Sequence, residues 1–388
     1  MVAVIGTFSF NTTPSVVFGA GSAARLGEIA AAQLGRRVLI VTDQGLVAAG
    51  LVAPAVSSLE QAGCAVSVFD KVVADPPESV VLEAVECGAG FGADAVIGLG
   101  GGSSLDVAKL VALLLRSGER LADIYGIGQV RGKRLPLLLS PTTAGTGSEV
   151  TPISIVTTGA HEKKGVVSPV LLPDIALLDP ELTYGLPAPV TAATGVDAMV
   201  HAIESFTSTS ANRNPISAAL ATEALRLLAG NISAAAHRGD HDARGKMLLG
   251  SMLAGQAFAN SPVAAVHALA YPIGGHYGIP HGLSNALVLP AVLEFNLPAA
   301  ESAYAELAPH AFPDLAREPS SSRAAAFIRR LAALSSDLGL PPRLRDVGIP
   351  ADAVPMLARE AMKQTRLLVN NPRPLEEANV AAIYEASW

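Results

Sequence analysis

The chain has 388 residues, of which half are hydrophobic and 16% are charged, and its formal net charge is −7. This length exceeds what one hydrophobic core usually supports, so two domains are expected. High hydrophobicity with low charge excludes an intrinsically disordered chain. The charges form no basic run that could follow a phosphate backbone, which argues against nucleic acid as a partner.

The N-terminus and the cysteines bear on the cellular compartment. The opening MVAVIGTFSFNTTP lacks the basic head and apolar stretch of a secretory signal, and the longest apolar runs are too short to span a bilayer. Cys64 and Cys87 have no C-x-x-C spacing and are expected to be small buried residues in a reducing cytoplasm. We therefore expect a cytoplasmic protein with no membrane partner.

Between about residues 14 and 185, short β-branched runs alternate with stretches whose apolar residues recur at helical spacing. The predicted strands are, in chain order, SVVFG, RRVLIVTD, AVSVFD, ADAVIGLGGG, LPLLLSP and PDIALLD. Strands that alternate with helices of this size indicate βαβ units and a parallel sheet covered on both faces. Residues 1–186 are therefore expected to form an α/β domain.

The fourth predicted strand runs directly into a glycine-rich turn and helix, GGGSSLDVAK, at 100–109. Glycines let a backbone approach a ligand without a Cβ in the way, and a helix N-terminus offers free N–H groups and a positive dipole end. A diphosphate fits this geometry, although a plain tight turn has the same composition.

Two further strand ends carry polar residues. SPTTAGTGSEVT, at 140–151, places hydroxyls where phosphate and ribose oxygens could bind, and Asp43 ends the second strand, where a carboxylate accepts hydrogen bonds from ribose hydroxyls and repels a 2′-phosphate. Each feature alone can be explained as turn or helix-cap chemistry. Together, the three strand ends favour a dinucleotide site that selects NAD over NADP.

After Pro187 the pattern changes to Ala- and Leu-rich helical stretches such as SAALATEALRLLAGNISAAAHR, with almost no strand signal. Residues 187–388 are therefore expected to form an all-helical domain, with a site in the cleft between the two domains.

Near the start of this domain, Asp197 and His201 stand at i and i+4, on one face of a helix. Such a pair can coordinate a cation, or it can simply stabilise the helix.

Residues 264–290 supply His267 and His281. We expect Pro272, with Gly274 and Gly275, to prevent one continuous helix, so that the chain turns within the segment and returns His281 towards His267. With the earlier pair, this makes one aspartate and three histidines, a ligand set suited to Fe(II) or Zn(II).

Five motifs resemble, in order and over nearly the whole chain, those of the iron-containing, or group III, alcohol dehydrogenase family. They are GGGSSLDVAK, PTTAGTGSEVT, DPELTYGLP, TGVDAMVHAIES and HALAYPIGGHYGIPHGLSNALVLP. The resemblance implies a Rossmann-like N-terminal domain and an all-α C-terminal domain, the dehydroquinate synthase-like architecture. It also implies NAD, Fe(II) with Zn(II) as the alternative, and a homodimer or larger homo-oligomer.

The resemblance assigns roles to individual residues. It implies metal ligation by Asp197, His201, His267 and His281. It implies cofactor contacts from Asp43, Gly101, Gly102, Ser103, Asp106, Thr142, Thr143, Gly145, Thr146, Lys164 and Thr183.

One position departs from the family. Many members carry a histidine four residues after the third ligand, often invoked in proton transfer, where this chain has Tyr271. Tyr271, or His276, which we expect at a loop position lining the pocket, or water with the ribose hydroxyls of the cofactor could carry the proton instead. Tyr271 could equally do no more than shape the pocket.

The sequence therefore predicts an NAD-dependent oxidoreductase that interconverts a small alcohol and its aldehyde or ketone by hydride transfer, with the metal as Lewis acid on the substrate oxygen. A hydroxyacid–oxoacid transhydrogenase and a maleylacetate reductase-like enzyme are alternatives of the same architecture. A non-catalytic metal- or nucleotide-binding protein is a more remote alternative.

Overall fold

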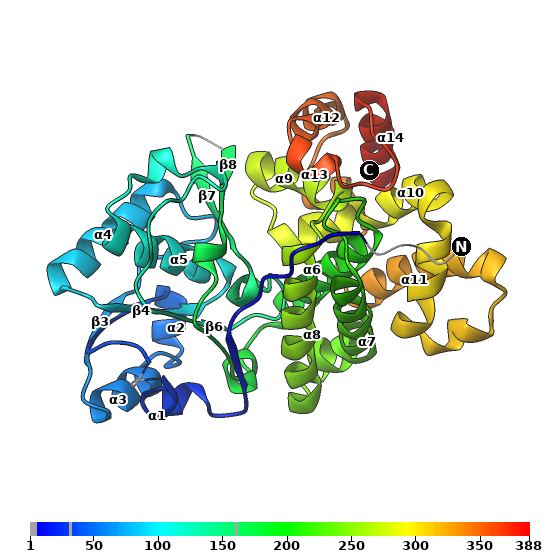
Figure 1. Cartoon of the computed structure of the whole chain (residues 1–388). Coiled ribbons are helices and arrows are strands. Elements are labelled where there is room, and N and C mark those ends of the chain that lie inside the picture. Colours follow the sequence, from blue (N-terminus) through cyan, green and yellow to red (C-terminus); the bar gives the residue numbers. More distant parts are fainter. Residues whose placement is uncertain (1–5, 31–32, 160–161) are drawn as a thin grey trace. The chain divides into compact units, whose positions relative to one another are not determined.

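The computed structural model describes residues 6–30, 33–159 and 162–388 and divides into two compact units (Figure 1). One unit is Asn11–Gly185. The other is Leu186–Trp388 together with the N-terminal segment that ends at Phe10. That segment is held to the second unit by Ser9, whose backbone exchanges two hydrogen bonds of 2.9 Å with the side-chain amide of Asn212.

The first unit is built on a six-stranded sheet in the order β1-β9-β6-β4-β2-β3, in which every pairing is parallel. All six predicted strands are confirmed. Their bounds are Ser15–Phe18 (β1), Arg37–Val41 (β2), Ala65–Phe69 (β3), Ala95–Gly100 (β4), Leu137–Pro141 (β6) and Ile175–Leu178 (β9).

Helices cover both faces of this sheet, as its apolar strands require. Side chains alternate along a strand, so that Leu39 and Val41 of β2 pack in one buried cluster and Val38 and Ile40 in another. The first cluster contains residues of α4 and α5, and the second contains residues of α1 and α3. The helices are α1 (Leu26–Ala30), α2 (Gln44–Ala48), α3 (Ala53–Gln61), α4 (Glu78–Phe91) and α5 (Gly102–Ser117).

A second, three-stranded sheet was not predicted. It consists of β5 (Gly126–Ile127), β8 (Glu162–Val167) and β7 (Ile153–Thr158), with β7 and β8 antiparallel. Its signal in the sequence is weak because β5 has only two residues and β8 reads EKKGVV, a charged segment with a glycine.

From Leu186 on, the regular elements of the second unit are all helices, as predicted. The three long helices α6, α7 and α8 run side by side (Figure 1). The helices are α6 (Ala188–Thr207), α7 (Pro215–His237), α8 (His241–Asn260), α9 (Ala265–Tyr277), α10 (His281–Ala311), α11 (Ser320–Asp337), α12 (Val354–Met362), α13 (Thr365–Leu368) and α14 (Glu377–Ser387).

The predicted position of the turn after His267 is wrong. Helix α9 continues through Pro272 and ends at Tyr277, and Gly278, with φ of 65°, makes the left-handed cap that ends it. A proline removes one helical hydrogen bond and often kinks a helix, but the helix need not end there. The chain does turn within the segment, and α10 begins at His281, directly after Pro280.

Helix α10 is long and apolar enough to cross a membrane by length and composition alone. However, 56% of its most apolar window is buried inside the protein. Burial in the core therefore accounts for its apolar character.

Candidate metal centre

Helix α6 carries three buried polar side chains on one face. Asp197, His201 and Glu204 are 2%, 4% and 3% exposed, and their spacing of four and three residues places them in one row along the helix. A carboxylate or imidazole is rarely buried without a partner, because desolvation of such a group is costly. Their burial therefore indicates that each has a specific partner inside the protein.

The start of α9 and the start of α10 bring two more histidines to this row. One ligand atom each from Asp197, His267 and His281 lies within 4.8 Å of the others. The Nε2 atoms of His267 and His281 are 3.8 Å and 3.7 Å from Oδ1 of Asp197. Gly282 permits this approach, because a Cβ there would collide with the backbone carbonyl of Ala193 on α6.

His201 lies beside this cluster, although the group of three donor atoms does not include one of its nitrogens. Its ring stacks on that of His267 with 4.6 Å between centroids, and on Phe258 with 4.3 Å. The structure thus brings together three of the four predicted metal ligands and places the fourth against them.

Asn285 lies among the donor atoms, and sequence reasoning missed it. Its Nδ2 donates to Oδ1 of Asp197 at 2.6 Å and lies 3.4 Å and 3.3 Å from Nε2 of His267 and His281. Its own Oδ1 is buried with no hydrogen-bond partner in the described part of the chain. Asn285 stands four residues after His281 on α10, and this helical spacing was the available signal.

The environment keeps Asp197 ionised. Burial raises the pKa of its carboxyl, but the three neighbouring histidines and the hydrogen bond from Asn285 outweigh burial and hold the pKa below its usual value. An ionised carboxylate that faces imidazole nitrogens is a typical donor arrangement for a metal ion.

These residues fit a divalent metal ion. Ligands that bind at about 2.1 Å in a tetrahedral arrangement lie about 3.4 Å apart, close to the separations found between Asp197 and the two histidines. Glu204 accepts a hydrogen bond of 2.6 Å from Nδ1 of His267, which leaves Nε2 of that ring with a lone pair. Nitrogen and carboxylate lone pairs thus converge on one point, where a cation is the natural partner.

Two residues of α9 were predicted to take part in catalysis. Tyr271 is half-buried, and its ring centroid is 5.8 Å from that of His281. His276 is exposed in the last turn of α9, so its predicted loop position is wrong. Its flanking glycine suggested a loop, but the helix continues to the next residue, Tyr277.

The predicted cofactor residues that follow β2, β4 and β6 gather at one end of the six-stranded sheet. Strands β2, β4 and β6 are adjacent and parallel, so the residues after them meet at their carboxyl ends. Gly101 caps α5 without a side chain, and a Cβ on Gly102 would lie 2.8 Å from Cγ2 of Thr146. The N-terminus of α5 therefore lies directly beside the segment after β6, a geometry suited to a phosphate. Ser103 lies in the first turn of α5, and Thr142, Thr143, Gly145 and Thr146 form that segment.

Other predicted cofactor residues have partners within the unit. Asp43 caps α2 by accepting a hydrogen bond from the Leu46 amide at 3.1 Å. Lys164 on β8 lies 3.4 Å from a carboxylate oxygen of Glu162. Thr183 is buried and donates to the carbonyl of Pro180 at 2.7 Å.

Asp106 is engaged on both carboxylate oxygens. Oδ1 accepts from the Ser148 hydroxyl at 2.6 Å, and Oδ2 accepts from the Ile155 amide at 2.9 Å. The neighbouring Lys109 is fully buried and donates to Ser148, to Thr151 and to the carbonyl of Ile153. These bonds hold the segment after β6 against α5.

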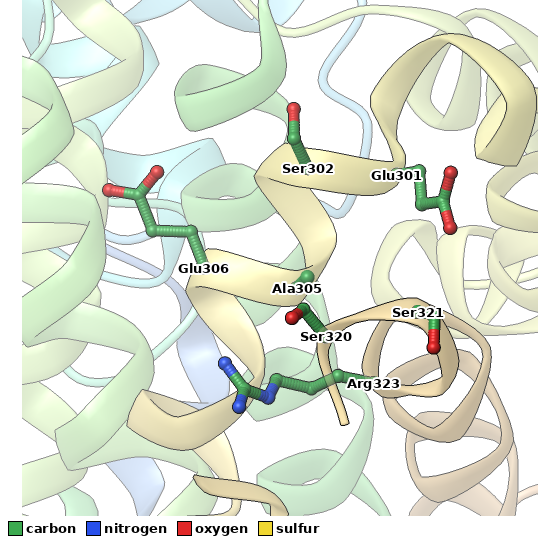
Figure 2. A pocket seen from close by; sticks show the side chains of 7 residues that line it. All are labelled: Glu301, Ser302, Ala305, Glu306, Ser320, Ser321 and Arg323. Atoms are coloured by element: carbon green, nitrogen blue, oxygen red, sulfur yellow. The ribbon is translucent and has the colours of Figure 1, made fainter. Parts of the chain in front are cut away.

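An open hollow of about 460 Å³ lies between α10 and α11 (Figure 2). The carboxylates of Glu301 and Glu306 lie well apart in it, and Arg323 donates to backbone carbonyls of Ala316 and Glu318. It therefore offers no convergent set of donors. Its lining residues are Glu301, Ser302, Ala305, Glu306, Ser320, Ser321 and Arg323.

The chain is similar to known proteins over most of its length. Residues 13–180 match the family model for iron-containing alcohol dehydrogenase, and residues 191–388 match the C-terminal model of the same family. Long-chain-alcohol dehydrogenase 1 of Geobacillus thermodenitrificans is 42% identical over 361 residues, which cover 91% of this chain and 90% of that protein.

Two solved structures share the complete fold. A 1,3-propanediol oxidoreductase has a TM-score of 0.95 and 34% identity, covering 98% of this chain and 100% of its own. A sulfoacetaldehyde reductase from Bifidobacterium kashiwanohense, solved in complex with NAD⁺, has a TM-score of 0.86 and 29% identity, covering 98% of each chain.

Proposed function

Because the chain belongs to the iron-containing alcohol dehydrogenase family, a family of oxidoreductases, we propose that it interconverts a small alcohol and its aldehyde or ketone with NAD(H) as the hydride carrier. The buried convergence of Asp197, His267 and His281 carries the proposal. We further propose that the protein is cytoplasmic and forms a homodimer or a larger homo-oligomer.

Asp197, His201, His267 and His281 would hold the metal, Fe(II) or Zn(II), which when bound supplies Lewis acidity to the substrate oxygen. His201 is included because its ring lies against that of His267. Asp197, His201 and His267 are buried, and removal from water strengthens the electrostatic effect of such side chains on a bound substrate.

When bound, NAD⁺ would supply the acceptor for the hydride of an alcohol, and NADH would supply the hydride for an aldehyde. The first N–H groups of α5, from Gly101 to Ser103, would bind the diphosphate. The hydroxyls of Thr142, Thr143 and Thr146, beside Gly145, would orient the phosphates and ribose, with Lys164 and Thr183 as further contacts. One oxygen of Asp43 caps α2, and the carboxylate would also accept from ribose hydroxyls. Asp106 would act indirectly, by holding the segment after β6 in place.

Tyr271 is proposed to hold the proton that leaves or reaches the substrate oxygen. Its ring lies beside His281 at the cluster, and a phenol hydroxyl both donates and accepts hydrogen bonds. His276, five residues further along α9 and exposed, would exchange protons with water.

Substitution of a ligand tests the proposal. His267→Ala should lose nearly all alcohol-dependent NADH formation, whereas His310→Ala, an exposed histidine of α10, should retain it. Wild-type activity in His267→Ala would contradict the proposed centre.

Metal removal tests the same proposal without a mutation. Protein stripped by a chelator should lose activity and regain it on addition of Fe(II) under anaerobic conditions or of Zn(II). Full activity in the stripped protein would contradict metal-dependent hydride transfer.

A substrate panel separates the alternatives. Short and long alcohols, diols and their aldehydes should be turned over with free NAD(H). Cofactor retained through dialysis, with hydride exchange between a hydroxy acid and an oxo acid, would instead indicate a transhydrogenase. Binding of NAD without turnover of any substrate would indicate a non-catalytic protein. Light scattering on the purified protein would measure the oligomeric state.

A further inference from the structure

Glu204 of α6 is a buried carboxylate with no predicted role. Its Oε2 accepts hydrogen bonds from the amide of Ala264 at 3.0 Å and from Nδ1 of His267 at 2.6 Å. Its Oε1 accepts from the amide of Val266 at 2.6 Å. Both oxygens are thus directed at the start of α9 and at the histidine in its first turn.

Glu204 fixes where α9 begins relative to α6. The N-cap residue of α9 is Ala264, which makes no side-chain cap hydrogen bond. The first amides of a helix need acceptors, and a carboxylate near them is also favoured by the helix dipole. Glu204 supplies this acceptor from α6, three residues after His201 on the same buried face.

The contact with His267 also determines which nitrogen of that ring carries the hydrogen. An ionised carboxylate only accepts hydrogen bonds, so Nδ1 must be the donor. Nε2 then presents its lone pair towards Asp197 Oδ1 at 3.8 Å. A contact of this kind sets both the tautomer and the orientation of a metal-binding histidine.

The charges of the region are consistent with a cation. In the part of the chain that the structure describes, Asp197 and Glu204 lie within 4 Å of histidine nitrogens and form ion pairs with no lysine or arginine. A divalent ion at the cluster would balance the charge of these two buried carboxylates. Without such a balance, burial of two like charges would be costly.

We propose that Glu204 is a positioning residue of the metal centre, which holds His267 with Nδ1 protonated and Nε2 directed at the metal. The inference rests on the metal centre of the proposed function. The side chain of Glu204 accepts hydrogen bonds from the amides of Ala264 and Val266 and from Nδ1 of His267, so its effect on the centre would pass through His267.

Glu204→Gln is the direct test, because glutamine has nearly the same size. The glutamine amide can lie in two orientations. In one, its NH₂ group faces Nδ1 of His267 and favours the opposite tautomer; in the other, the NH₂ group faces the Val266 amide, which then lacks its acceptor. The affinity of metal-free protein for Zn(II), measured by competition with a chelator, should fall by about 10- to 100-fold. Glu149→Gln, the same change at a buried glutamate of the other unit, should leave zinc affinity unchanged.

A second measurement separates positioning from simple helix capping. If Glu204 only capped α9, Glu204→Gln would lower the stability of metal-free and zinc-saturated protein equally, and zinc affinity would stay within twofold of wild type. If it positions His267, the stabilisation gained on adding zinc should shrink, because that gain follows the affinity. The Co(II) absorption spectrum should also change, because it reports the ligand geometry. Unchanged zinc affinity and an unchanged cobalt spectrum would overturn the inference.

The wild-type measurement distinguishes a failure of the proposed function from a failure of the role of Glu204. Wild-type protein that bound neither Zn(II) nor Co(II) would overturn the proposed function itself. Wild-type binding matched by Glu204→Gln would overturn only the role of Glu204. If Glu204→Gln does not fold, Glu204→Asp serves instead. It keeps the carboxylate but draws it back from Nδ1, so wild-type zinc affinity in that variant would likewise overturn the inference.

Discussion

The burial of Glu149 predicts a specific dependence of stability on pH. It lies in the 3-10 turn Ser148–Val150 and is 1% exposed. Burial raises the pKa of its carboxyl from 4.5 to about 7, against the opposing effects of a backbone hydrogen bond and the charge of Lys109. Between these two values, the native state retains a proton that the unfolded chain releases.

The sign and size of the effect follow from this difference. As the pH rises from about 4.5 to about 7, ionisation favours the unfolded state, so the free energy of unfolding falls; above about 7 the loss is complete. A gap of about 2.5 pKa units at about 1.4 kcal/mol per unit corresponds to about 3 kcal/mol. Glu149→Gln removes the titrating group, so the variant should gain about 3 kcal/mol relative to wild type between acid and mildly alkaline pH.

Urea unfolding followed by far-ultraviolet circular dichroism at several pH values would measure this difference. Fluorescence of Trp388, the single tryptophan, reports on the other unit and is insufficient alone. Glu60→Gln, a change at an exposed glutamate of the same unit, serves as the control and should not alter the pH dependence. A stability difference between wild type and Glu149→Gln that is the same at all pH values would refute the reasoning.

Three further substitutions have defined outcomes. Lys109→Met should lower the free energy of unfolding by about 3–5 kcal/mol, because it leaves the buried acceptors around the ammonium without a donor; an unchanged denaturant midpoint would contradict that network. Gly102→Ala should raise the Kd for NAD⁺ at least tenfold in titration calorimetry, because the new methyl group meets Thr146, and wild-type affinity would exclude the α5 N-terminus as the diphosphate site. If the phenol of Tyr271 carries the proton, Tyr271→Phe should lower kcat by on the order of 10²-fold with little change in NAD⁺ affinity. An unchanged kcat and an unchanged pH–rate profile would show that Tyr271 only shapes the pocket.

The sheet and the histidine segment show how far local pattern predicts structure. Six strands were identified because each is a short apolar run that ends at Gly, Asp or Pro, and these local signals do not depend on tertiary packing. The strand β8, with two adjacent lysines, gives no such signal and forms because β7 pairs with it. Helix α9 passes through Pro272 because packing of its buried face outweighs one lost hydrogen bond.

The sequence by itself determined the two kinds of architecture, the glycine-rich strand ends and the identities of the candidate ligands, because these depend on periodicity and on residue types at fixed spacing. Only the tertiary structure decided which side chains meet. Glu204 reaches His267 across 63 residues, and Asn285 reaches Asp197 across 88. Their hydrogen bonds arise from the packing of α6 against the starts of α9 and α10. No periodicity within one segment encodes a contact between different helices, because that contact depends on how the helices pack around a shared core.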